Sequence, residues 1–303
     1  MKLGNAELYV GPAGWSYDDW EGIVYPRPKP KGFRPPAFLA QYFNAIELNN
    51  TFYRPPQPGF CWRWAKDVAD RPGFLYTAKL WKQFTHPGME LDGEDSGARP
   101  ARPPESARAE HWTRKDVETF RTGIEPLVKA GRLGALLMQF PWSFRYEPQS
   151  RQYLAGVVEE FRDLPLMLEV RSRAWVSEEA LRFIESLGVG FCNIDQPAFR
   201  GNIPLTSHAF GKLGYLRLHG RNAQAWFSKD AGRDQRYNYL YKEEELDELE
   251  KALREIAARV ERMFVIANNH YRGQAVATGI QLIRRLTGED VGAPEGVAEL
   301  YGL

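Results

Sequence analysis

The chain has 303 residues, of which 43% are hydrophobic and 26% are charged, the ordinary mixture of a globular protein. This composition excludes a disordered chain, a collagen and a coiled coil. Lys plus Arg (40) nearly equals Asp plus Glu (39), and the net charge of +1 excludes a uniformly basic nucleic-acid coat but not a local basic patch.

Eight short, β-rich apolar runs are predicted as strands. In chain order they are residues 8–11, 45–49, 74–79, 135–140, 166–170, 189–195, 214–220 and 263–268. Most of them are nearly continuous apolar runs, which is the pattern of a parallel sheet covered on both faces.

Segments with helical spacing lie between these runs. We expect helices over residues 38–45, 115–131, 177–188, 243–263 and 273–286, whereas the stretch 196–213 is only weakly helical. Ser177 is a favourable N-cap, and Gly131 and Gly188 are favourable helix ends.

Eight strands alternating with helices predict an α/β protein, a TIM-type (β/α)8 barrel that forms a single domain over residues 1–303, with an irregular sixth helix. The competing doubly wound sheet usually has five or six strands and a G-x-G-x-x-G turn after the first strand, which is absent here. Two segments exceed a minimal barrel. They are a Pro-rich basic loop at 25–36 and a polar insertion at 92–110.

In such a barrel, function collects at the carboxyl ends of the strands. An ionisable side chain inside an apolar strand loses its hydration, so it must be paired or functional. Six such groups stand at this end, and we take five of them as catalytic candidates and Arg217 as a ligand-binding one. The catalytic candidates are Glu47, Lys79, Glu169, Asp195 and His219. The alternative is a satisfied ion network that only plugs the end of the barrel.

Five of the nine tryptophans follow closely behind a strand end, where they either stack on a base or a sugar or simply pack. They are Trp15, Trp81, Trp142, Trp175 and Trp226. The last predicted helix begins near Gly273, and its backbone N–H groups either hold a phosphate or follow a tight turn. The candidate ligand-binding residues are Gly14, Trp15, Tyr17, Asn49, Tyr53, His86, Gln139, Arg171, Trp175, Arg217, Arg221, Asn268, Asn269 and Gly273.

Eight motifs occur in an order that resembles the YecE-like family, known as domain of unknown function 72. They are GPAGWSYDDWEGIVYP, IELNNTFYRPP, KLWKQFTH, LMQFPWSF, LEVRSRAW, NID, YLRLHG and ANNHYRGQA. The resemblance covers nearly the whole chain and implies a TIM-type barrel, but it supplies no established reaction. The family's motif positions match Gly14, Trp15, Glu47, Thr51, Tyr53, Lys79, His86, Gln139, Glu169, Arg171, Trp175, Asp195, Arg217, His219 and Asn269. The chain departs from the family at Pro12-Ala13, where a small hydroxyl or thiol pair is more usual, and in the insertion at 92–110.

The first functional hypothesis is that the chain binds and hydrolyses, or cleaves as a lyase, a small phosphate-bearing ligand or a nucleic acid. Glu169 or Glu47 would be the general base and His219 an acid or a ligand, beside basic side chains that clamp the anion. These clamps are Lys79, Arg171 and Arg217. No cofactor is predicted. An alternative version holds a divalent metal on Glu47, Glu169, Asp195 and His219.

Two other hypotheses stay open. One is a non-catalytic protein that binds single-stranded nucleic acid or a sugar through its aromatic side chains and the basic loop at 25–36. The other is a glycoside hydrolase that uses two of the carboxylates of Glu47, Glu169 and Asp195, although neighbouring basic residues should keep these acids ionised.

Several other classes have no support in the sequence. The chain lacks a P-loop, a G-x-S-x-G and an H-E-x-x-H motif, which removes the NTPase, serine-hydrolase and zincin interpretations. Cys61 and Cys192 match no metal or redox spacing, and no signal peptide or apolar run of about 18 residues occurs. We therefore expect a cytoplasmic protein with no membrane partner, and no protein partner can be inferred.

Overall fold

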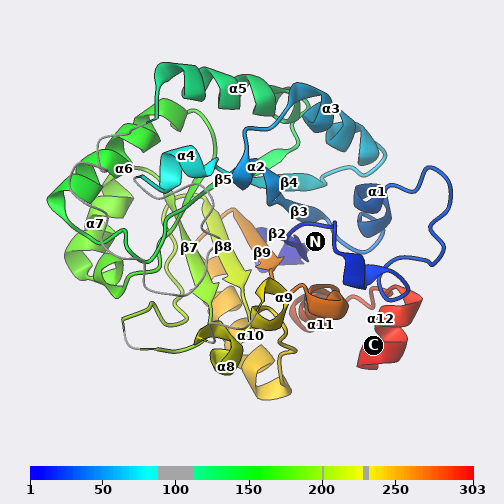
Figure 1. The fold of residues 1–303 in the computed structure, drawn as a ribbon. Helices are drawn as coiled ribbons and strands as arrows, with labels where there is room; N and C mark the ends of the chain where they lie inside the picture. Colours follow the sequence, from blue (N-terminus) through cyan, green and yellow to red (C-terminus); the bar gives the residue numbers. More distant parts are fainter. Residues whose placement is uncertain (88–111, 200, 228–231) are drawn as a thin grey trace.

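The computed structural model describes residues 1–87, 112–199, 201–227 and 232–303, so the predicted insertion at 92–110 lies outside the described residues. A nine-stranded mixed sheet curls through the centre of the molecule in the order β1-β2-β9-β8-β7-β6-β5-β4-β3 (Figure 1). Its strands are β1 (Lys2–Leu3), β2 (Ala6–Pro12), β3 (Ala45–Leu48), β4 (Leu75–Lys79), β5 (Leu133–Gln139), β6 (Leu166–Glu169), β7 (Gly190–Asp195), β8 (Leu213–Leu218) and β9 (Arg262–Ala267).

All eight predicted strands are present as β2 to β9, and neighbouring strands along this part of the sheet pair in parallel. The prediction missed only β1, a short strand that pairs antiparallel with β2. Most strand residues are buried, as expected for a parallel sheet with helices around it.

Helices surround the sheet, as Figure 1 shows for α3, α5, α6, α7, α10 and α11. The helices are α1 (Pro35–Leu39), α2 (Asn50–Tyr53), α3 (Pro58–Asp67), α4 (Lys82–Thr85), α5 (Arg114–Lys129), α6 (Pro148–Phe161), α7 (Glu178–Ser186), α8 (Ala223–Phe227), α9 (Arg233–Arg236), α10 (Glu243–Ala257), α11 (Gln274–Thr287) and α12 (Glu295–Tyr301). Three short 3-10 helices are η1 (Asp18–Trp20), η3 (Arg173–Val176) and η4 (Tyr271–Gly273). Among the described residues, no helix is long and apolar enough to cross a membrane.

Two predicted helices have wrong bounds. The helix expected at 38–45 is α1, which begins earlier because Pro35 fits the first helical position, and it ends at Leu39. The helix expected at 243–263 ends at Ala257, because the chain must turn before β9. Between β7 and β8, residues 196–199 and 201–212 contain no helix, in line with the weak periodicity of this stretch.

The closed barrel is not confirmed, because no ladder of backbone hydrogen bonds joins β2 to β3 among the described residues. Asn44 takes the place of the ladder: its side-chain oxygen accepts from the Val10 N–H at 2.9 Å, and its amide donates to the Leu8 carbonyl at 2.8 Å. Beyond them, one isolated bridge pairs Ala13 with Glu47. We call this contact the β2–β3 junction.

The β2–β3 junction is close-packed at Gly11. A Cβ atom at this position would stand only 1.7 Å from the Ala45 carbonyl oxygen, so no other residue fits without moving the two backbones apart. The sheet is therefore open in its hydrogen bonding at this point, although its two edges touch.

Candidate functional site

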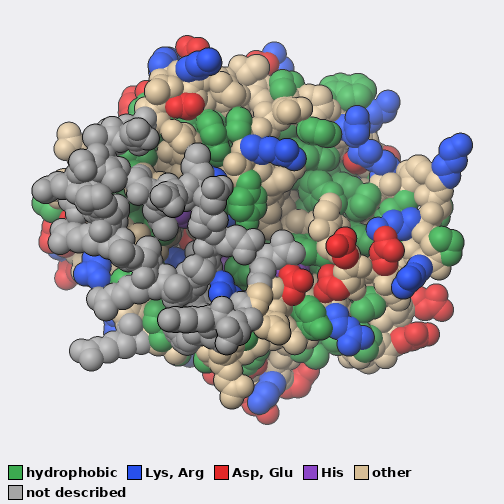
Figure 2. All heavy atoms as spheres, in the orientation of Figure 1, with side chains coloured by type: hydrophobic (Ala, Val, Ile, Leu, Met, Phe, Trp, Pro, Cys, Tyr) green, Lys and Arg blue, Asp and Glu red, His purple; other side chains and the backbone are tan. Residues whose placement is uncertain are grey.

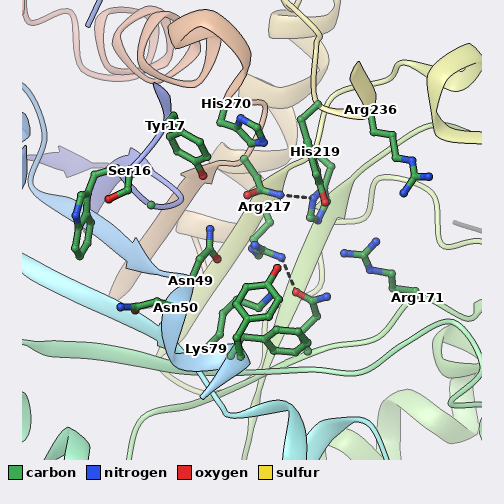
Figure 3. A pocket seen from close by; sticks show the side chains of 17 residues that line it. Ser16, Tyr17, Asn49, Asn50, Lys79, Arg171, Arg217, His219, Arg236 and His270 are labelled. Atoms are coloured by element: carbon green, nitrogen blue, oxygen red, sulfur yellow. Dashed lines mark hydrogen bonds between the residues drawn. The ribbon is translucent and has the colours of Figure 1, made fainter. Parts of the chain in front are cut away.

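A cavity of about 320 Å³ opens at the carboxyl ends of the strands, and Figure 3 shows its walls. This volume lies at the small end of the range for ligand sites. The lining residues come from the segments that follow β2, β3, β6 and β9, from β4, β5 and β8 or just beyond, and from α2 and α9. They are Gly14, Trp15, Ser16, Tyr17, Asn49, Asn50, Phe52, Tyr53, Lys79, Gln139, Arg171, Arg217, His219, Arg236, Tyr237, Asn268 and His270.

The cavity brings together many of the residues that the sequence singled out. Because parallel strands end at one edge of the sheet, side chains far apart in the chain meet there. The predicted residues that line the cavity are Gly14, Trp15, Tyr17, Asn49, Tyr53, Lys79, Gln139, Arg171, Arg217, His219 and Asn268.

Four basic side chains reach the cavity wall, and none of its described lining residues is acidic. Lys79 ends β4, and its Nζ lies 4.0 Å from the centre of the Phe52 ring. Arg171 follows β6, Arg217 lies within β8, and Arg236 ends α9. Figure 3 shows that these side chains enter the same space from different elements.

Two predicted catalytic carboxylates lie beneath this wall rather than in it. Glu47 and Glu169 are both 0% exposed, and neither lines the cavity. Arg217 joins them, because its Nη2 donates to Glu47 Oε1 and its Nη1 to Glu169 Oε2, each at 2.7 Å. Arg171 adds two bonds from Nε and Nη2 to Glu169 Oε1, at 3.2 and 3.1 Å. We call these four residues the Arg217 cluster.

The Arg217 cluster is further tied to its surroundings. Gln139 Oε1 accepts from Arg217 Nη1 at 3.2 Å, and the Tyr215 hydroxyl donates to Glu47 Oε2 at 2.9 Å. Burial alone would raise the pKa of Glu169, but the guanidiniums of Arg217 and Arg171 overcome it and hold this pKa well below its usual range. Glu169 is therefore ionised at neutral pH, and its main contacts are arginines.

Asp195 is buried and belongs to a separate group of polar side chains. It accepts from Arg221 Nε at 2.9 Å and from the Tyr241 hydroxyl at 2.7 Å, and Arg221 also pairs with Glu248. Neither Asp195 nor Arg221 lines the cavity. Both were predicted as site residues. In the structure, their hydrogen bonds connect the end of β7 to the segment around α10.

Four further predicted ligand-binding residues lie outside the cavity. Trp175 is fully buried and donates its indole N–H to the Phe144 carbonyl at 2.7 Å. Asn269 donates to the Tyr239 carbonyl and to Thr278, which fixes a loop. His86 packs edge-on against a phenylalanine ring.

Gly273 is the fourth of these residues, and its surroundings favour the tight turn over the phosphate site. It is left-handed, with φ +80°, directly before α11. A Cβ added there would stand 2.8 Å from a methyl carbon of Val24, so the start of α11 faces packed apolar side chains.

Of the predicted tryptophans whose side chains the structure describes, only Trp15 lines the cavity. The Trp81 ring packs against Phe84, and the indole N–H of Trp142 donates to the Gly201 carbonyl at 3.4 Å. The side chain of Trp226 lies outside the described part of the chain.

The basic loop at 25–36 also contributes nothing to the cavity. Its Lys29 pairs with Glu21, and its Arg34 holds Asp67 of α3 through two hydrogen bonds at 3.0 and 2.6 Å. Two of the four basic side chains in this loop therefore pair with neighbouring acids.

The sequence reasoning missed six lining residues. They are Ser16, Asn50, Phe52, Arg236, Tyr237 and His270. Four of these stand next to a predicted residue, so taking whole strand-end segments rather than single positions would have found them. Arg236 ends the short helix α9 and Tyr237 follows it, well after the end of β8, and no sequence signal places them here.

His219 has a defined environment at the back of the cavity. The Asn268 side-chain amide lies 3.0 Å from Nδ1, and Nε2 faces Glu169 Oε1 at 3.7 Å. With the amide donating to Nδ1, the ring proton sits on Nε2 and faces the carboxylate. Burial lowers the pKa of His219 to about 4 despite this carboxylate, and the nearby arginines act in the same direction. The ring is therefore neutral at pH 7.

The depressed pKa of His219 predicts a pH-dependent stability. In the unfolded chain His219 takes up its proton near pH 6.5, but in the folded protein only near pH 4, so the unfolded state binds more protons between these values. The free energy of unfolding should therefore fall as the pH drops through this window, by about 3 kcal/mol at most.

Urea denaturation of the protein and of His219→Gln at several pH values checks this. We expect a shallower pH slope in the variant between pH 6.5 and 4, because Gln does not titrate. Equal slopes would contradict the assignment of a buried neutral ring.

The metal version of the first hypothesis finds no assembled ligand set. Among the described residues, no group of three or more His, Cys, Asp or Glu side chains is placed to hold a metal ion. The carboxylates that would have contributed are bonded to Arg217 or to Arg221 instead.

Comparison with known proteins identifies the family of the chain. Residues 9–298 match the family model described as a protein of unknown function, DUF72. The chain belongs to this family. The YecE-like family, which the sequence resembles, is the same family. The chain is 27% identical to the UPF0759 protein YunF of Bacillus subtilis, over 97% of this chain and all of that protein.

Two solved structures from the same family are similar along most of the chain. One is a DUF72 protein of Thermotoga maritima, 31% identical, with a TM-score of 0.72 over 92% of this chain and 99% of that one. The other is a DUF72 protein of Enterococcus faecalis, 21% identical, with a TM-score of 0.75 over 95% of this chain and 98% of that one. These two structures share the α/β fold of this chain, and the description of the family gives no function.

Proposed function

We propose that this protein binds a small phosphate-bearing ligand, such as a nucleotide or the end of a nucleic acid, in the strand-end cavity. The observation that carries the proposal is the cavity wall, where Lys79, Arg171, Arg217 and Arg236 stand together and no described lining residue is acidic. Basic side chains in a partly desolvated cavity interact strongly with an anion, since hydrogen bonds between charged partners are about twice as strong as neutral ones.

The rest of the wall suits the uncharged part of such a ligand. Trp15, Tyr17 and Phe52 present aromatic rings, and the Tyr17 ring stacks on His270 at 4.2 Å with 8° between the planes. Asn49 and Asn268 supply amide groups. Aromatic faces beside amides favour a planar base or a sugar attached to the phosphate.

The geometry favours binding over hydrolysis by a carboxylate base. A general base must reach the proton that it removes. Glu47 and Glu169 are bonded to arginines, and Asp195 is bonded to Arg221 outside the cavity. The same placement argues against the glycoside-hydrolase hypothesis, which needs two carboxylates facing the substrate.

A matched pair of ligands tests the proposal in a calorimetric titration. Adenosine 5′-monophosphate should bind at least about tenfold more tightly than adenosine, because only the phosphate meets the basic side chains. Its affinity should also fall as salt is added. Equal affinity for the two ligands, or no binding of either one or of inorganic phosphate, would sink the proposal.

We also propose that the sheet closes into a (β/α)8 barrel through the β2–β3 junction. The supports are the two hydrogen bonds of Asn44, the bridge between Ala13 and Glu47, and the close approach at Gly11. A side chain in place of a backbone ladder still sets the spacing of two neighbouring strands.

A further inference from the structure

An aromatic surface borders the cavity on the side of α2 and α3. Tyr53, Phe60 and Trp62 are 56%, 43% and 60% exposed, and they are the three exposed aromatic side chains among the large hydrophobic residues of the described chain. They lie within ten positions of one another in the sequence. Phe60 and Trp62 are two positions apart and therefore flank the exposed side of α3, with the exposed Arg63 and Lys66 between them around the helix. Several large exposed aromatic rings on one part of a protein mark a binding surface.

A basic side chain stands over each of these rings. The Arg63 guanidinium lies 5.7 Å from the centre of the Phe60 ring, and Lys66 Nζ lies 5.2 Å from that of Trp62. The remaining pair is Lys82 Nζ above Tyr53, at 5.9 Å. We call these six residues the aromatic–basic face.

The face carries little negative charge. The only acidic residue in α2, α3 and α4 is Asp67, and it is held by two hydrogen bonds from Arg34 with its side chain 9% exposed. In Figure 2, apolar and basic side chains gather over the region where Figure 1 labels α3. The face therefore combines planar rings with positive charge.

The aromatic–basic face is continuous with the cavity. Tyr53 belongs to both. Trp15 of the cavity wall packs edge-on against Trp64 at 5.6 Å, and Trp64 in turn stacks with Phe60 at 6.2 Å. A chain of aromatic contacts thus runs from the cavity to the exposed side of α3.

We propose that the aromatic–basic face binds single-stranded nucleic acid, one nucleotide of which places its phosphate in the cavity. The proposal rests on the proposed function for the cavity, and it names the ligand as a strand rather than a free nucleotide. A single strand offers both complements at once, since its unpaired bases stack on aromatic rings and its phosphates meet the cations. Bases in a duplex are already stacked on one another, which leaves none for Phe60 and Trp62.

Charge also argues against the simplest alternative occupant of the aromatic–basic face, a second copy of this chain. In a two-fold dimer this face would lie against itself, so that Arg63, Lys66 and Lys82 would meet the same cations of a second copy. Like charges across an interface oppose association. A polyanion is the complementary partner.

Fluorescence titration with an oligothymidylate of about 12 nucleotides tests this proposal. Trp62→Ala and Phe60→Ala should each weaken binding of the oligonucleotide by about tenfold, while the affinity for adenosine 5′-monophosphate stays unchanged. Leu300→Ala is the matched control, because Leu300 is 44% exposed on α12. This variant should bind the oligonucleotide with the affinity of the parent protein.

A charge variant gives a second readout. Lys66→Gln should reduce the slope of log affinity against log salt by about 0.7, the share of one phosphate contact on a single strand. Lys251→Gln, an exposed lysine of α10, should leave the slope unchanged. If Lys66 had only a structural role in α3, Lys66→Gln would leave the slope unchanged.

The outcomes separate the two proposals. Undiminished oligonucleotide binding by both Trp62→Ala and Phe60→Ala overturns the inference, as does a concentration-dependent dimer that these substitutions abolish. If adenosine 5′-monophosphate binds but the oligonucleotide binds no more tightly, the inference fails and the cavity proposal stands. If neither binds, both fail.

Discussion

Replacing Arg217 with methionine is expected to lower the free energy of unfolding by about 3–5 kcal/mol. Arg217 is 1% exposed and bridges Glu47 and Glu169, both fully buried. Methionine fills much of the same space but leaves Glu47 without its cation and Glu169 with Arg171 alone. An uncompensated buried charge is far more costly than the loss of the pair as a whole.

Urea denaturation measures this effect, and a further set of variants identifies its cause. Adding Glu47→Gln and Glu169→Gln to Arg217→Met should recover part of the loss, since the buried charges are then removed together. Arg182→Met is the matched control. It breaks an exposed pair with Glu178 on α7 and should change stability by less than about 1 kcal/mol. A mild effect of Arg217→Met would mean that Arg217 does not compensate buried charge in this cluster.

Replacing Arg171 with methionine should weaken the binding of adenosine 5′-monophosphate by about tenfold or more. Arg171 lines the cavity, and Glu169 fixes its guanidinium through Nε and Nη2. A cation that is already oriented loses little conformational freedom when it meets a phosphate. Lys79→Met should act in the same direction, because Lys79 shares the wall.

Calorimetry on folded variants checks this second effect. The affinity for adenosine, which lacks the phosphate, should change little in Arg171→Met. The surface variant Arg182→Met should bind both ligands like the parent protein. If Arg171→Met lowered both affinities equally, the residue would shape the cavity rather than meet the anion.

The sequence was sufficient for strands β2 to β9, although not for β1 or for the closure of the sheet, and the reason is local. Each of β2 to β9 is an apolar run, and burial on both faces makes such runs stand out from the polar helices between them. Family motifs and strand ends together also pointed to the cavity wall, as Lys79, Gln139 and His219 illustrate. Short-range patterns carry this information because strand direction alone decides which end a residue reaches.

The role of the acids could not be read in the same way. Glu169 and Lys79 both stand at strand ends, yet one lies beneath the wall and the other in it. Which of the two occurs depends on partners such as Arg217, which is 48 positions from Glu169 in the chain. Arg236 was missed for a similar reason, since only the tertiary course of the segment around α9 brings it to the cavity.

The β2–β3 junction also affects how the molecule responds to an occupant. The loop after β2 supplies Trp15 and Tyr17 to the cavity wall on one side of the β2–β3 junction. The segment after β3 supplies Asn49 on the other side. These strands share few main-chain hydrogen bonds, so a ligand that contacted both loops would bridge the two strands. Binding of such a ligand is therefore expected to hold the two edges of the sheet together.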